Sequence, residues 1–284
     1  MTSKHSLWKD SFSRLAEDKW AMASLGIIII YSVVAILSAM GLIASDWAQE
    51  VGASNLPPST EHFFGTDIFG RDVLRKIIRG TQIAMSVGLA TSLIAIPIGV
   101  ILGALAGYFG GWVDDFITWL YTTFSSIPNI MLLISITMIL GKGLFAVYVA
   151  LGATSWVTLC RLIRGEVMKH KEREYVLAAG AIGGGHLRKL FIHILPNVTH
   201  IIIINTSLQF QVAIKSEVIL SYLGLGVQGE PSWGTMIDDA KLELSRGVWW
   251  QLAGATLAMF FVVLAFNLLG DALRDSLDPK LKGK

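Results

Sequence analysis

The stretch AMSVGLATSLIAIPIGVILGALAGYF, residues 84–109, contains no charged side chain. About 20 helical residues, each rising 1.5 Å, are enough to cross the roughly 30 Å hydrocarbon core of a bilayer. The whole chain agrees with a membrane location, because its 284 residues have a mean hydropathy of +0.60 and only 15% are charged. Such a composition is not typical of a soluble domain. We therefore expect a transmembrane helix here.

Further apolar runs predict an all-α membrane protein with six transmembrane helices. Two of the runs are weaker, one because it is short and one because it contains Lys215 and Glu217. The first run is too long for the apolar part of a signal peptide and has no convincing cleavage site, so we expect a retained span. The five further runs are residues 21–44, 116–140, 144–160, 198–223 and 248–269.

The distribution of lysine and arginine predicts the orientation of these spans. With both termini in the cytoplasm, fifteen of the 23 cationic residues fall in inside segments. The exception is GRDVLRKIIRG, residues 70–80, whose four cations would lie outside. Val73, Ile77 and Ile78 share roughly one helical face, so we expect a short helix along the outer interface.

The predicted organisation follows from these spans and this orientation. It comprises a cytoplasmic tail (1–20), a first transmembrane helix (21–44), an extracytoplasmic loop with the interfacial helix (45–83), a five-helix core (84–270) that includes a cytoplasmic loop (161–197), and a second cytoplasmic tail (271–284).

Small residues and prolines inside the spans indicate close packing and broken helices. Gly99, Gly103 and Gly107 are four residues apart, a spacing that lets two helix backbones approach closely in lipid. The alternative is that neighbouring helices merely tolerate these glycines. Pro97 and the SIPN of residues 126–129 should bend or break their helices. Broken helices at membrane depth usually face protein or a water-filled cavity, which favours a conduit over a simple anchor.

The motifs of common enzymes are absent from the sequence. There is no G-x-x-x-x-G-K-[ST], H-E-x-x-H or G-x-S-x-G, so we expect no ATP site and nominate no catalytic, cofactor-binding or metal-binding residue. His193 and His200 lie seven residues apart and are more typical of ordinary hydrogen-bonded histidines than of metal ligands. The single cysteine, Cys160, excludes an internal disulfide and is expected to be buried.

Polar residues within the spans are costly and therefore suggest function. Asn205, Gln209 and Ser216 follow one face of the fifth span, and Asn129 lies at the broken third span. We predict that these four residues line a translocation pathway, with interhelical hydrogen bonding as the alternative. Lys215 and Glu217 point in different directions and are not expected to form an ion pair.

The longest inside loop has a helical pattern. In EREYVLAAGAIGGGHLRKLFIHILPN, residues 172–197, a short helix with small residues precedes three glycines, and an amphipathic segment follows. Leu187, Leu190, Phe191 and Ile194 should tie that segment to the membrane domain. The small-residue helix could dock into a groove of a cytoplasmic partner or simply fold against the membrane face.

This loop resembles the EAA motif of the permease subunits of binding-protein-dependent ABC importers. Ala178, Ala179, Gly183, Leu195 and Pro196 match the motif, whereas Leu177 replaces its glutamate. Other stretches are similar to the dipeptide, oligopeptide and nickel permease group, on the side of its C-type subunit. They are FGTDIFGRDVLRKIIRG (64–80), AGYFGGWVDD (106–115), LSYLGLGVQGEPSWGTM (220–236) and NLLGDALRDSLDPKLK (267–282).

The resemblance implies a type I ABC importer permease fold with a cytoplasmic coupling helix, in the inner membrane of a bacterium. It further implies a homologous second permease, two cytoplasmic ATPase subunits or domains that hold ATP and magnesium, and an extracytoplasmic binding protein. Peptides fit it best as substrates. Residues for ATPase coupling would be Tyr175, Ala178, Ala179, Gly180, Gly183, Leu195 and Pro196, and residues for binding-protein docking would be Gln228, Glu230 and Trp233.

Two alternatives remain open. The same machinery could import nickel complexes or another small solute, because specificity in such systems is largely set by the binding protein. A secondary transporter would need coupling charges in the spans or an inverted repeat, and neither is convincing in this sequence.

Overall fold

A computed structural model describes residue 13 and residues 15–277. The outer parts of both expected tails, residues 1–12, 14 and 278–284, lie outside the described residues. The described part is helical with two isolated β-bridges and no strand. Its helices are α2 (Lys19–Ala39), α3 (Val73–Phe109), α4 (Gly111–Ser126), α5 (Asn129–Leu140), α6 (Leu144–Thr154), α7 (Trp156–Lys171), α8 (Glu174–Ala181), α9 (His186–Arg188), a π-helix (Lys189–Ile194), α10 (Leu195–Tyr222), α11 (Trp233–Leu244) and α12 (Trp250–Leu277).

The expected six spans are present, one of them as a broken helix. Five helical stretches are long and apolar enough to cross a membrane, and the bent pair α4–α5 makes a sixth when it is counted as one span. The two helices of this pair meet at an angle of 90°. The break falls at Ile127 and Pro128, which have extended backbone, as the SIPN pattern predicted.

Several span boundaries differ from the expected ones. The first helix ends at Ala39 instead of residue 44, and α12 continues through Leu277 into the expected tail. The fourth span is longer than expected, because α6 and α7, separated only by Ser155, together run from Leu144 to Lys171. The hydropathy pattern placed the end of this span just before the first arginine, Arg161, whereas the helix continues past it to Lys171.

The expectation of a separate interfacial helix at residues 70–80 is wrong. Residues from Val73 onwards form the first turns of α3, which runs without interruption to Phe109. Asp72 caps its N-terminus by accepting a hydrogen bond from the backbone N–H of Arg75. Val73 and Ile77 face the protein core instead of a lipid interface. The prediction of an apolar helical face is confirmed, but Val73 and Ile77 on that face contact protein.

The three glycines of α3 are sites of direct backbone contact with α7. A Cβ atom at Gly103 would lie 2.5 Å from the carbonyl oxygen of Cys160, and one at Gly107 would lie 2.5 Å from that of Arg164. Gly99 meets the carbonyl of Trp156 in the same way, at 2.9 Å. The close-packing interpretation is thus confirmed, and α3 and α7 cross with almost no side-chain spacer.

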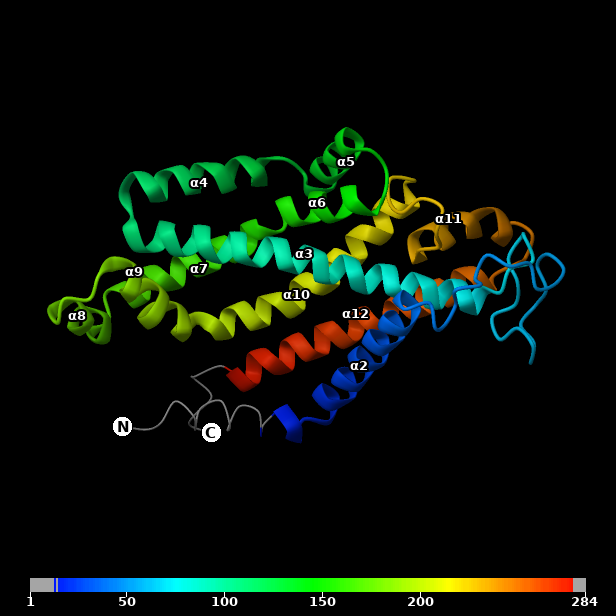
Figure 1. Ribbon diagram of the computed structural model, residues 1–284, viewed down its shortest axis with the longest axis horizontal. Helices are drawn as coiled ribbons and strands as arrows, with labels where there is room; N and C mark the ends of the chain where they lie inside the picture. The colour runs from blue at the N-terminus through cyan, green and yellow to red at the C-terminus, as the bar shows by residue number, and fades with distance from the viewer. Residues whose placement is uncertain (1–12, 14, 278–284) are drawn as a thin grey trace.

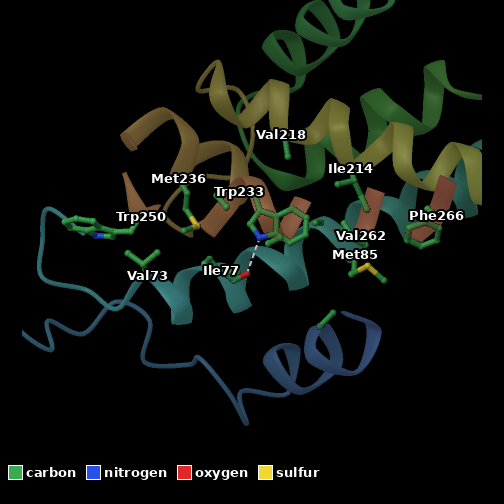
Figure 2. Close-up of a cluster of buried hydrophobic side chains, with 14 of the residues drawn as sticks. Val73, Ile77, Met85, Ile214, Val218, Trp233, Met236, Trp250, Val262 and Phe266 are labelled. Atoms are coloured by element: carbon green, nitrogen blue, oxygen red, sulfur yellow. Dashed lines mark hydrogen bonds between the residues drawn. The ribbon is translucent and has the colours of Figure 1, made fainter. Parts of the chain in front are cut away.

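A cluster of buried hydrophobic residues joins α3, α10, α11 and α12. Figure 2 shows Trp233 of α11 between these helices, with its indole N–H donating to the carbonyl of Ile77 at 3.2 Å. Around it lie Val218 from α10 and Met236 from α11. This core anchors the short helix α11 to the transmembrane bundle.

The short helices lie at opposite ends of the bundle. In Figure 1, α8 and α9 lie at one end of the long axis, and α11 lies at the other with the loop that precedes α3. α2 begins, and α12 ends, on the side that is turned toward α8. The described ends of the first and last spans are therefore on one side, as an even number of spans requires.

Candidate coupling surface and translocation pathway

The segment between α7 and α10 forms the protruding end of the molecule. α8 ends in a glycine-dependent stop, because Gly183 has φ +84 and the N–H groups of Gly183 and Gly184 donate to the carbonyls of Gly180 and Ala179 at 3.0 and 2.9 Å. These two backbone hydrogen bonds, together with a residue in the left-handed conformation, form a Schellman motif. Gly183 thus has a defined role in ending α8.

The two faces of α8 differ in exposure. Val176 and Ala179 are buried against the bundle, whereas Leu177 is 62% exposed and Ile182, just after the helix, is 88% exposed. Ala178 is also exposed. The expectation that Ala178, Ala179 and Gly183 all contribute to ATPase coupling is therefore corrected for Ala179, because its side chain is buried against the bundle whereas Ala178 and Gly183 are exposed.

The remaining coupling residues surround this helix. Tyr175 is partly exposed, and its hydroxyl forms a 2.7 Å hydrogen bond with Nδ1 of His170. Burial raises the pKa of Tyr175, so its hydroxyl stays protonated. Gly180 is half-buried, Leu195 is half-buried and Pro196 is exposed at the start of α10.

A π-helix connects this end to the bundle, which the sequence did not predict. Leu190 and Ile194, in the π-helix Lys189–Ile194, are fully buried, but Leu187 and Phe191 are 60% and 46% exposed. Two of the four expected anchors are therefore confirmed and two are wrong. The wider turn of a π-helix rotates the side chains relative to an α-helical pattern.

A cavity of about 520 Å³ lies beside the break between α4 and α5. It brings together three of the four expected pathway residues, Asn129, Asn205 and Gln209. None of its lining residues is charged. The side-chain nitrogen of Gln209 is buried without a hydrogen-bond partner among the described residues, whereas Asn205 donates to the carbonyl of Ile201 at 2.9 Å. Ser216 is half-buried and does not line this cavity.

The opposite end contains the three expected docking residues. Gln228 is exposed and Glu230 is half-buried in an ion pair with Arg79 at 2.9 Å, and both line a second cavity of about 320 Å³. Trp233 is 0% exposed, so the expectation that it contacts a binding protein is wrong. Large aromatic residues satisfy a core and an interface equally well, and the sequence pattern does not separate these roles.

A buried cation at this end was not predicted. Lys76 donates to Asp67 at 2.8 Å and to Gln251 at 2.7 Å, and both lysine and aspartate are almost fully buried. A buried charge needs such partners, since an uncompensated one is strongly destabilising. The signal available in the sequence was a lysine between core-facing residues Val73 and Ile77 of one helix.

Comparison with a solved structure shows the fold. The fold matches a chain of the MetNI methionine ABC transporter in inward-facing conformations, with a TM-score of 0.55, 16% sequence identity, and coverage of 72% of this chain and 95% of that chain. The fold is therefore that of a type I ABC importer permease, a multi-pass membrane protein.

The particular family follows from the sequence comparisons. The chain belongs to the family described as binding-protein-dependent transport system inner membrane component, which matches residues 99–283. Residues 6–58 match the N-terminal transmembrane domain of oligopeptide transport permease C. The resemblance to the C-type permease group is thus confirmed. The chain is a permease component of an importer, and its family is not itself the ATPase.

Curated relatives cover nearly the whole chain. The dipeptide transport system permease protein DppC of Bacillus subtilis is 38% identical over 96% of this chain and 86% of the relative. The oligopeptide transport system permease protein OppC of the same organism is 36% identical over 98% of this chain and 91% of the relative. The glutathione transport system permease protein GsiD of Pectobacterium atrosepticum is 34% identical over 97% and 92%.

Proposed function

We propose that this chain forms half of the translocation pathway of an ATP-driven peptide importer. The uncharged, amide-lined cavity beside the α4–α5 break carries the proposal, because Asn129, Asn205 and Gln209 offer both donors and acceptors to peptide bonds. A cavity without charged groups would accept peptides irrespective of the charge on their side chains. The names of the curated relatives, which concern dipeptides, oligopeptides and glutathione, support the same substrate class.

The proposed assembly pairs this chain with a homologous permease, two cytoplasmic ATPase subunits or domains that bind ATP and magnesium, and an extracytoplasmic binding protein. Both termini and α8 lie in the cytoplasm, and the end with Gln228 and Glu230 faces the binding protein. ATPase closure would move α8, with its exposed Leu177 and Ala178, and shift the bundle between inward-open and outward-open states.

Uptake by reconstituted transporter tests the substrate proposal. Proteoliposomes should accumulate radiolabelled dialanine only with ATP and binding protein, and other dipeptides should compete. The variant Asn205→Ala/Gln209→Ala should reduce uptake about tenfold, because two amide contacts are lost. Ser216→Ala, in the same helix but outside the cavity, is the matched control. Nickel-complex uptake without dipeptide competition would overturn the proposal.

Copurification tests the coupling role of α8. Ala178→Arg places a long cation on the exposed face of α8 without entering the core, so the chain should remain in the membrane but lose its ATPase subunits. Ala178→Ser keeps the small size and should retain them. Normal binding-protein-stimulated ATP hydrolysis by the arginine variant would contradict this role.

A further inference from the structure

A third cavity, of about 290 Å³, lies where α3, α7, α8 and α9 meet. Figure 1 shows these short helices at the end of the bundle, next to the ends of α3 and α7. The lining includes Tyr108 from α3, Lys171 from α7, Leu177 and Gly180 from α8, His186 from α9 and Lys189 from the π-helix. It shares Leu177 with the exposed face of α8, but the proposed pathway does not account for it.

Two ammonium groups converge on this cavity. The Nζ atom of Lys171 lies 5.7 Å from the ring centroid of Tyr108. Lys189 is half-buried, and its Nζ lies close to Gly180, at 3.5 Å from the position that a Cβ atom there would take. Within the described part of the chain, neither lysine forms an ion pair. The lysines therefore present unneutralised positive charge.

One further hydrogen-bond donor completes the lining. The hydroxyl of Tyr108 lies 3.0 Å from Nδ1 of His186. When Tyr108 donates this hydrogen bond, Nε2 of His186 carries the ring proton and can donate in turn. Several donors from different elements suit an anion with several oxygens better than a single carboxylate oxygen.

No carboxylate lines the cavity. Glu172 and Glu174 are close in sequence to Lys171 but are not among the lining residues. Leu177 lines the cavity and adds no charge to it.

The cavity lies at the level where the uncharged part of α3 ends. Gly107 packs against the backbone of Arg164, the second of the cations that begin on α7, and Tyr108 and Phe109 follow directly. Phe109, Val176 and Leu177 add apolar walls to the cation-lined site. Basic pockets at this depth on the cytoplasmic side fit the headgroups of anionic lipids, whose leaflet attracts lysines.

We propose that this cavity binds a phosphate group through Lys171, Lys189 and Nε2 of His186, whose ring the hydroxyl of Tyr108 orients. The phosphate of an anionic phospholipid and a free phosphate share this chemistry. The lipid source rests on the proposed cytoplasmic location of α8, whereas the site itself does not. An occupied site would link α8 to the end of α3.

Binding by the purified full-length chain in detergent tests the site without any ATPase or binding protein. Phosphatidylglycerol should bind, and phosphatidylcholine should not. Lys171→Gln/Lys189→Gln should weaken phosphatidylglycerol binding by roughly fivefold per lysine, hence about 25-fold. Leu177→Glu, an exposed change that adds a carboxylate, should weaken it as well. Inorganic phosphate that competes in the low millimolar range would indicate the free anion as ligand.

Lys169→Gln/Arg188→Gln is the matched control, because it removes two cations that lie on α7 and α9 outside the cavity. Equal affinities of the cavity variant and this control variant for both lipid and phosphate would overturn the proposal. Retained lipid binding together with loss of the ATPase subunits from the cavity variant would assign the lysines to an acidic partner protein, which also overturns it. Failed peptide uptake would leave these affinities unchanged, so the two proposals fail separately.

Discussion

At the scale of single residues, the packing of α3 on α7 depends on glycines, which have no side chain to separate the two backbones. Gly103 allows the carbonyl of Cys160 to occupy the space that any side chain would need. Glycine in a helix interior costs roughly 0.5–1 kcal/mol relative to alanine, and the gain from close backbone contact must offset that cost. The balance between the two terms can be measured at individual glycines.

Gly103→Ala should destabilise the protein by about 1–3 kcal/mol, because its Cβ would lie 2.5 Å from that carbonyl oxygen. Gly26→Ala is the control, since Gly26 lies in the interior of α2 with nothing within 4 Å of the added atom. This control should be neutral or slightly stabilising. Thermal unfolding in detergent compares them, and equal midpoints would contradict the close-contact interpretation.

Glu243 of α11 predicts a pH dependence of stability outside the spans. Burial raises its pKa above the ordinary value of 4.5, while the N–H of Ile68, donating at 3.2 Å, and nearby Lys76 lower it by less. Burial also raises the pKa of the neighbouring Asp239. A raised carboxyl pKa means that the folded state binds the proton more tightly than the unfolded state.

Acidification toward the ordinary value of 4.5 should therefore increase the contribution of Glu243 to stability, and rising pH through its higher folded pKa should remove that contribution. Glu243→Gln should flatten the dependence of unfolding midpoint on pH in this range. Asp271→Asn, an exposed carboxylate at the far end of α12, is the control. An unchanged slope in Glu243→Gln would contradict the assignment.

At the scale of elements, α8 owes its length to the Schellman stop at Gly183 and its position to the two residues it buries. The helix has eight residues, too short for stability by itself in water, so tertiary contacts must maintain it. Val176 supplies one such contact with the core of α3 and α7. The proposed coupling element is thus a short, docked helix with a defined end.

Gly183→Ala should destabilise the end of α8 by about 1 kcal/mol, because alanine does not readily adopt φ +84. Gly185→Ala is the control, since Gly185 has φ −65 and nothing within 4 Å of an added Cβ. Hydrogen exchange measured by mass spectrometry should show faster exchange of residues 178–184 in the first variant only. Equal protection in both variants would argue against the stop.

At the scale of the whole molecule, the two ends of the bundle carry different kinds of surface. One end bears α8 and the phosphate-site cavity, and the other bears α11, the loop before α3 and the buried Lys76–Asp67 pair. Every proposal about partners depends on which end faces the cytoplasm. The excess of lysine and arginine on the α8 side supports a cytoplasmic location for that end.

Cysteine labelling tests this orientation. In a Cys160→Ala background expressed without the proposed ATPase subunits, Leu177→Cys should react with a membrane-impermeant maleimide only in permeabilised cells. Arg246→Cys, an exposed position just after α11, should react in intact cells. Both positions are exposed, so each is a control for the other. The reverse pattern would invert the orientation.

The sequence by itself determined the number of spans, the break at Pro128, the glycine contact of α3 and the permease family. These features depend on local rules, since an uncharged run of about 20 residues is typical of a membrane-spanning helix and a proline removes a backbone hydrogen bond. The same rule was wrong at Pro97, which lies inside α3 without breaking it. The sequence also predicted that Asn129, Asn205 and Gln209 share one site, because polar groups are conspicuous in apolar helices, and the three residues line one cavity.

Only the tertiary structure decided which apolar residues face protein. In a membrane, apolar side chains face lipid as well as the core, so periodicity identifies a face but not its neighbour. For this reason Trp233 and Ala179 were assigned to surfaces although they are buried, and residues 73–83 were separated from α3. The convergence of Lys171 and Lys189 likewise arises from the folding of four elements onto one another.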